Sequence, residues 1–225
     1  MTLSETRSRD AATPTGHVAP PAVSGTGRLY GWAEALAFMA MMNILVVVFT
    51  LAGAVLLGWA PAVAAAVACS RRRLRSETHP WLRTFATIWR REFWRANRLQ
   101  AAGNVVIALL ASNLLLFRGE PGHDVLAVAL AVALGLAVVH QILAVVMDAH
   151  YELGAGECLR LAGAFAVRFP GAPLLLAVAT ALATAFTIAL PGLLPVLTLG
   201  AWLYLCTALC LSFFAANDRA LDATL

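Results

Sequence analysis

Polar side chains inside the apolar stretches are the residues of this chain whose type and position allow chemistry. Asn43, Asn104, His140 and Gln141 all lie in segments long enough to span a bilayer. Such groups either join neighbouring helices by hydrogen bonds or hold a water, a proton or a solute hydroxyl. Counted from the predicted cytoplasmic ends of their helices, the first three lie roughly 8–16 Å deep. We therefore predict an intramembrane polar cluster of these four residues, with interhelical hydrogen bonding as the structural alternative.

The usual residue patterns of enzymes are missing from the sequence. The other histidines fall in tail or loop positions without the i, i+4 spacing of helical metal ligands, and the four cysteines form no C-x-x-C pair. We find no nucleophile motif, phosphate loop or paired carboxylates; Glu34 and Asp148 fall at the ends of predicted spans. We predict that the protein is not an enzyme and uses no cofactor or metal.

The arginines are unevenly distributed. All 16 basic residues are arginine, and nine of them lie between Arg71 and Arg98. On a helix, the aromatic and apolar residues from Trp81 to Ala96 share one arc and the arginines share the opposite one, with Glu92 and Trp94 as exceptions. This pattern predicts an interfacial helix with its rings in the acyl boundary and its guanidinium groups at anionic headgroups. The predicted contacts with lipid or a protein partner are Arg71, Arg72, Arg73, Arg75, Arg83, Arg90, Arg91, Arg95 and Arg98.

Composition decides the class of protein. The chain is 61% hydrophobic and only 12% charged, against about 45–50% and 25% in soluble domains, which excludes a soluble globule. Nucleic acid also attracts basic clusters, but the aromatic residues here face away from the arginines, so we expect no nucleic-acid binding. Residues 1–28 have the composition of a disordered tail. Residues 29–217 then form one membrane domain, and residues 218–225 form a second short tail.

Uncharged stretches locate the spans. Residues 35–70 would extend about 54 Å as one helix, against a hydrocarbon core of about 30 Å. We therefore expect two crossings with a turn between Gly53 and Pro61, or one long tilted crossing as the alternative. Further spans are predicted over 99–117, 125–147 and twice within 169–217, with a break near Pro191–Pro195. With a second amphipathic helix over 148–168, the prediction is an all-α integral membrane bundle of about six transmembrane helices and two cytoplasmic interfacial helices.

Arginine placement predicts the orientation of these spans. Six spans put both termini and the whole arginine cluster on one side, and the positive-inside rule makes that side the cytoplasm of a bacterial inner membrane. Small residues spaced by four, such as Ala127, Ala131 and Gly135, allow close helix packing. Packing within one subunit and a homo-oligomer contact explain this spacing equally well.

An ordered set of short motifs resembles the YesL family. The motifs are Asn43-Ile44-Leu45, Ala60-Pro61-Ala62, Arg71–Arg75, Trp81–Arg98, Tyr151-Glu152-Leu153 and Arg168-Phe169-Pro170, spread over residues 30–215. The family usually has a Pro-x-x-Thr-x-Gly run before the Pro-Ala pair, where this chain reads Ala54–Ala60. The resemblance implies a bacterial multi-span membrane protein without established biochemistry, with an accessory role in carbohydrate uptake. It brings no catalytic residue with it.

Two functions remain open at this point. The first is an accessory protein that docks, through its arginines, on a membrane transporter complex or on anionic lipid. The second is a small-solute transporter that uses the polar cluster. A transporter requires a polar cavity that reaches a surface near Trp59–Pro61 or His140.

Overall fold

The computed structural model describes residues 25–77, 79–117, 119, 122–151 and 154–222. Within them the chain forms only helices, which confirms the all-α prediction. The elements are α1 (Gly25–Ala52), α2 (Leu56–Leu74), α3 (Trp81–Phe117), α4 (Asp124–His150), α5 (Ala155–Arg168), α6 (Gly171–Ala189), the 3-10 turn η1 (Pro191–Leu193), the π-helical turn η2 (Leu194–Thr198) and α7 (Leu199–Asp222).

Five segments of the described chain are long and apolar enough to cross a membrane: 29–52, 81–117, 124–150, 171–189 and 191–219. The protein is therefore a multi-pass helical membrane protein. The second predicted span corresponds to α2, which is not among the five. Its last turn contains Arg71, Arg72 and Arg73, which shortens the apolar part of this 19-residue helix.

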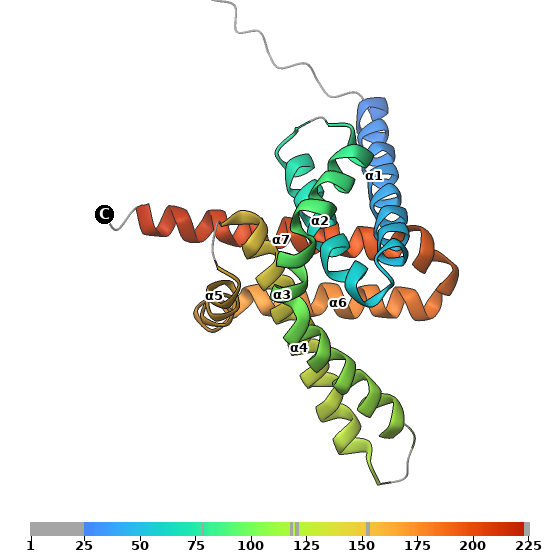
Figure 1. Cartoon of the computed structure of the whole chain (residues 1–225), viewed down its shortest axis with the longest axis vertical. Coiled ribbons are helices and arrows are strands. Elements are labelled where there is room, and N and C mark those ends of the chain that lie inside the picture. The colour runs from blue at the N-terminus through green and yellow to red at the C-terminus, as the bar shows by residue number, and fades with distance from the viewer. Residues whose placement is uncertain (1–24, 78, 118, 120–121, 152–153, 223–225) are drawn as a thin grey trace, which may run out of the picture.

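The helices form a body with one projecting hairpin (Figure 1). In the body, α1, α2 and the first half of α3 pack together, and α6 and α7 run side by side across them. The second half of α3 and the first half of α4 project away as an antiparallel pair. The start of α1 lies at the top of the view, α5 and the end of α7 lie at its left, and the end of α3 and the start of α4 lie at its bottom.

The reversal between α1 and α2 lies at residues 53–55, within the predicted range. A Cβ atom on Gly53 would lie 2.3 Å from the Cα of Gly58, so only glycine allows the two helices to approach this closely. Ala54 and Val55 have φ angles of 58° and 63°, a left-handed conformation that is strained for a β-branched residue. The alternative of one continuous crossing over residues 35–70 is therefore wrong.

The predicted separate interfacial helix over residues 81–98 is also wrong, because α3 runs unbroken for 37 residues to Phe117. No proline interrupts it, and the junction Arg98–Ala102 consists of good helix formers. The predicted aromatic arc exists, but it packs on the protein itself. Phe85 is fully buried and its ring lies 5.1 Å from that of Phe49 on α1, while Trp81 contacts Phe38 at 5.1 Å.

The second predicted amphipathic helix is present as α5, although it begins later than expected because α4 continues to His150. Its apolar face buries Cys158, Ala162 and Phe165, and Phe165 packs edge-to-face on Phe214 of α7. Two boundaries also differ from expectation, since α1 already begins at Gly25 and α7 continues to Asp222. The rest of the expected amino-terminal tail, residues 1–24, lies outside the described residues.

Candidate functional site

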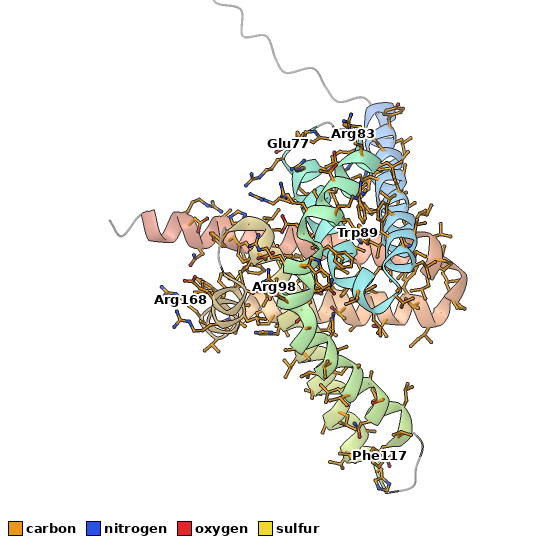
Figure 2. The ribbon with its side chains drawn as sticks, viewed as in Figure 1. Glu77, Arg83, Trp89, Arg98, Phe117 and Arg168 are labelled. Carbon is orange, nitrogen blue, oxygen red and sulfur yellow. The ribbon has the colours of Figure 1, made fainter. Side chains whose placement is uncertain are left out.

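An exposed arginine surface occupies one side of the first half of α3. We define this arginine face as Arg83, Arg90, Arg91 and Arg98, all of which are exposed; Figure 2 labels its two ends. Trp94 lies among them with 68% of its surface exposed. The opposite side of the helix packs into the protein, where Phe85, Ile88 and Ala96 are buried. This packing holds α3 in place and so fixes the direction of the arginine face. The guanidinium groups therefore project from a rigid support.

Other predicted arginine contacts are used inside the protein. Arg95 of α3 donates to Asp148 of α4 at 2.6 Å and lies 3.6 Å from Glu92, which explains how Glu92 is tolerated near the apolar arc. Arg73 pairs with Glu34 of α1 at 3.1 Å. Arg71 donates to the backbone carbonyl of Ala149 at the end of α4. Of the remaining two, Arg72 is half-buried and Arg75 is exposed.

The proline turn of α2 is held by side chains of α3. Pro61 lies inside α2 and has no N–H, so the carbonyl of Leu57 loses its partner within the helix. Asn97 donates to this carbonyl at 2.9 Å, and Gln100 donates to the carbonyl of Ala60 at 2.9 Å. Backbone breaks at membrane depth are tolerated when neighbouring helices bond the freed groups, and α3 does so here.

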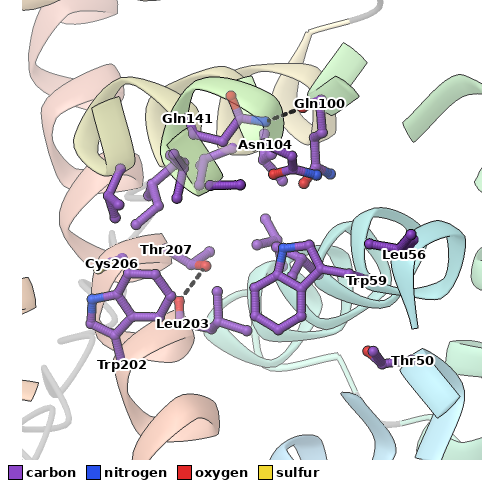
Figure 3. A pocket seen from close by; sticks show the side chains of 18 of the residues that line it. Thr50, Leu56, Trp59, Gln100, Asn104, Gln141, Trp202, Leu203, Cys206 and Thr207 are labelled. Carbon is purple, nitrogen blue, oxygen red and sulfur yellow. Dashed lines mark hydrogen bonds between the residues drawn. The ribbon is translucent and has the colours of Figure 1, made fainter. Parts of the chain in front are cut away.

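A cavity of about 390 Å³ lies between α2, α3, α4 and α7, with Thr50 of α1 at its edge. Gln100, Asn104 and Gln141 lie on one wall, opposite Trp59 and Trp202 (Figure 3). The rest of the lining is mainly aliphatic, and none of the lining residues is charged. Two polar atoms of the lining side chains, Thr50 Oγ1 and Gln141 Oε1, are buried and have no hydrogen-bond partner within the described residues.

The cavity is open at the surface of the helix bundle. Ala108 in its lining is exposed, so a molecule can enter there.

The structure brings together only part of the predicted polar cluster. Asn104 and Gln141 line the cavity, and Gln141 donates to the backbone carbonyl of Gln100 at 3.3 Å. His140 faces elsewhere, with its Nε2 atom 3.2 Å from the carbonyl of Leu159 on α5. Asn43 is not among the cavity residues either.

Asn43 instead holds the irregular segment before α7. Its side chain is fully buried and donates to the carbonyls of Leu194 and Pro195 at 3.1 and 2.6 Å. Its Oδ1 accepts the N–H of Gly200 at 2.9 Å. A Cβ atom on Gly200 would lie 2.1 Å from the carbonyl oxygen of Met39, so α1 and α7 meet here backbone to backbone.

The sequence analysis missed several cavity residues, of which Gln100 is the most informative. Gln100 and Asn104 are four residues apart and therefore share one face of α3. This i, i+4 amide pair at the start of an apolar run was a readable signal. Trp202 also lines the cavity, and its ring N–H donates to Thr180 on α6 at 3.1 Å, which fixes the indole in the cavity wall.

The thiol on α5 is held in its neutral form. Burial, with a smaller contribution from the nearby Asp148 carboxylate, raises the pKa of Cys158 to about 11. A thiol of this kind is unreactive near neutral pH. Among the described residues, no three His, Cys, Asp or Glu side chains gather as a metal site would require.

Two comparisons with known proteins find a match, and the one with a family model falls on the first three helices. A family model with the description "Protein of unknown function, DUF624" matches residues 39–114, a third of the 225 residues. The chain is also 35% identical over 89 residues to the "Uncharacterized protein YesV" of Bacillus subtilis (strain 168). This match covers 39% of the chain and 43% of that protein, so the chain spans less than half of its relative. No solved structure matches. Over the helices that carry the arginine face, the chain is therefore similar to a protein family described as of unknown function.

Proposed function

We propose that the protein is an accessory component of a membrane uptake system, which it contacts through the arginine face. The observation that carries the proposal is the division of the arginines into two sets. Arg71, Arg73 and Arg95 bond groups of the protein itself. Of the arginine face, Arg91 pairs with Glu92 of its own helix at 2.9 Å, whereas within the described residues no acidic side chain forms an ion pair with Arg83 or Arg90. These exposed charges are available to an acidic surface of a partner.

Trp94 supports a protein partner. Exposed tryptophan and arginine side chains side by side are the residue types that contribute most to protein–protein binding energy. A supporting helix that is already packed keeps the entropic cost of association low. Anionic headgroups are the competing contact for the same charges. Because the resemblance to the YesL family implies a role in carbohydrate uptake, the partner that we propose is a carbohydrate importer.

The orientation that we propose places the arginine face in the cytoplasm, together with both termini. Arg73 at the end of α2 pairs with Glu34 near the start of α1, and Figure 2 places Glu77 and Arg83 at this same end of the fold. The positive-inside rule favours the cytoplasm for this arginine-rich end. Reporter fusions at Pro80 and Gly119 test this. They are expected in opposite compartments, and a common compartment would contradict the proposed topology.

The partner is tested by co-purification in mild detergent, followed by mass spectrometry. The triple variant R83Q/R90Q/R91Q is expected to lose a transport protein that wild type retains. The matched control is R72Q/R75Q, which removes charge from the end of α2 and leaves the arginine face intact. If the triple variant loses only anionic phospholipid, the arginine face is a lipid contact. If it loses neither, the proposal is wrong.

A transporter is the second candidate function, and the cavity beside Trp59 favours it. The lining, however, is mainly aliphatic and carries no charge, which suits a hydrophilic solute poorly, because polar groups enter an apolar space only at a cost. Uptake of radiolabelled sugars by proteoliposomes that contain the purified chain alone tests this alternative. We expect no uptake above that of empty liposomes.

A further inference from the structure

The cavity between α2, α3, α4 and α7 carries an inference that is independent of the arginine face. We propose that it binds one uncharged amphiphile, whose hydroxyl group lies at the Gln100–Asn104–Gln141 wall and whose hydrocarbon part lies against Trp59 and Trp202. The volume of about 390 Å³ is at the lower end of the range for ligand sites, about 300–1,000 Å³. The cavity therefore fits a single chain or a small molecule.

Charge excludes most other ligands. No Asp, Glu, Arg or His side chain lines the cavity. An ionised carboxylate, phosphate or ammonium group would enter without a counter-charge, which is strongly unfavourable in an apolar space. A sugar would bring many hydroxyl groups to a lining that offers few polar partners. An uncharged molecule with one hydroxyl group matches the lining.

The polar atoms of the cavity give the ligand an orientation. The amides of Gln100 and Gln141 are tied to the backbone of α2 and α3, so they form a preorganised wall. The amide of Asn104 lies beside them in the same wall (Figure 3), where it can bond the hydroxyl group of the ligand. The opposite wall presents indole rings, which favour hydrocarbon.

Entry is possible from the side of the helix bundle. Ala108 lines the cavity and is exposed, and α3 has no buried residue beyond Gln100. Ala108 therefore marks an opening toward the space that lipid chains occupy. A lipid-soluble molecule reaches this opening from the bilayer, without passing through water.

Quenching of tryptophan fluorescence tests the site in the full-length protein in detergent. Three probes share one chain length: a bromoalkanol, the corresponding bromoalkane and the corresponding bromoalkanoate at pH 8. Bromine quenches indole rings that it contacts, and Trp59 and Trp202 lie in the cavity. We expect saturable quenching by the alkanol at about fivefold lower concentration than by the alkane, which corresponds to one net hydrogen bond. The alkanoate should quench only in proportion to its concentration.

Variants separate the site from general partitioning into the micelle. Ala108→Phe places a ring at the opening, where the exposed position tolerates it, and should abolish saturation. Ala102→Phe is the matched control, because Ala102 is also exposed on α3 but does not line the cavity. Asn104→Leu should raise the half-saturating alkanol concentration to that of the alkane.

Each contrary result overturns a stated part of the proposal. Equal quenching in the wild type, Ala108→Phe and Ala102→Phe would show that there is no site. Equal affinity for alkane and alkanol would remove the hydroxyl contact, and saturable binding of the alkanoate would remove the neutral ligand. The R83Q/R90Q/R91Q variant should quench like wild type, so failure of the proposed partner contact and failure of this site are distinguishable.

Discussion

Replacement of Asn43 by valine tests the most heavily bonded polar side chain inside the fold. Asn43 is fully buried and makes three hydrogen bonds, two to the carbonyls of Leu194 and Pro195 and one from the N–H of Gly200. Valine removes all three and leaves these backbone groups without that partner. A net hydrogen bond contributes about 0.5–1.5 kcal/mol, and interhelical bonds in membranes average about 0.6 kcal/mol. We therefore expect a loss of about 2–4 kcal/mol.

Thermal unfolding of the full-length protein in mild detergent measures this loss. For a chain of this length, 1 kcal/mol shifts Tm by about 2–4 °C, so Asn43→Val should melt about 5–15 °C below wild type. Asn113→Val is the matched control, because Asn113 is only half-buried and its side-chain amide donates to the carbonyl of Leu109 in its own helix. Its effect should remain within about 0.5 kcal/mol.

A second variant at Asn43 keeps the shape of the side chain and changes only its hydrogen-bonding groups. Asn43→Asp keeps the acceptor for Gly200 but replaces the amide donor with an oxygen that faces two carbonyls. It should therefore destabilise at least as much as valine. If both variants melt within 2 °C of wild type, about the shift for less than 1 kcal/mol, the argument from buried hydrogen bonds is refuted.

Three further predictions follow from other contacts. Gly58→Ala should destabilise the fold by about 1–3 kcal/mol, because the added Cβ would lie 2.3 Å from the carbonyl oxygen of Thr50 on α1. Gly135→Ala is the control and should be neutral, since nothing lies within 4 Å of its Cβ position. Thermal unfolding compares the two variants. Arg95→Gln should cost about 1.5–3 kcal/mol by removing a charged hydrogen bond from the mostly buried Asp148, and a double-mutant cycle with Asp148→Asn measures the coupling. Burial raises the pKa of Cys158 to about 11 and leaves its side chain without exposed surface, so maleimide labelling at pH 8 in the Cys69→Ser/Cys206→Ser/Cys210→Ser protein should be at least about tenfold slower in the folded than in the denatured state.

Each of these has a plain contrary outcome. Equal melting of the two glycine variants would show that the α1–α2 crossing adapts to a methyl group. Additive effects in the double-mutant cycle would show that the ion pair contributes no coupling energy. Labelling at pH 8 as fast as in the denatured protein would show that the α5 thiol is accessible and ionised.

The helices were predictable from the sequence because charge and hydropathy decide where a chain can cross a membrane. The turn near Gly53, the break at Pro191–Pro195 and the separate α5 all follow from local composition. The continuity of α3 was not foreseen. The change from an arginine-rich segment to an apolar one at Arg98 was read as the end of a helix, but backbone geometry responds to proline and glycine rather than to polarity.

The candidate site was less predictable, because it depends on which faces meet. Counting depth placed Asn43, Asn104 and His140 at one level, but depth does not give the direction of a side chain around its helix axis. His140 faces α5 and Asn43 faces η2, so only Asn104 and Gln141 reach the cavity. The aromatic face of α3 was likewise assigned to lipid because the sequence does not show that Phe38 and Phe49 of α1 are near enough to cover it.

The unbroken length of α3 has a mechanical consequence. Its 37 residues extend about 55 Å, so one stiff rod joins the arginine-bearing end to the tip of the projecting hairpin. Its first half packs on α1 and α2, and no residue of α3 beyond Gln100 is buried. A sideways push on the far tip would therefore be transmitted as a lever about this packed half. Binding at the arginine-bearing end and the tilt of the projecting hairpin would change together.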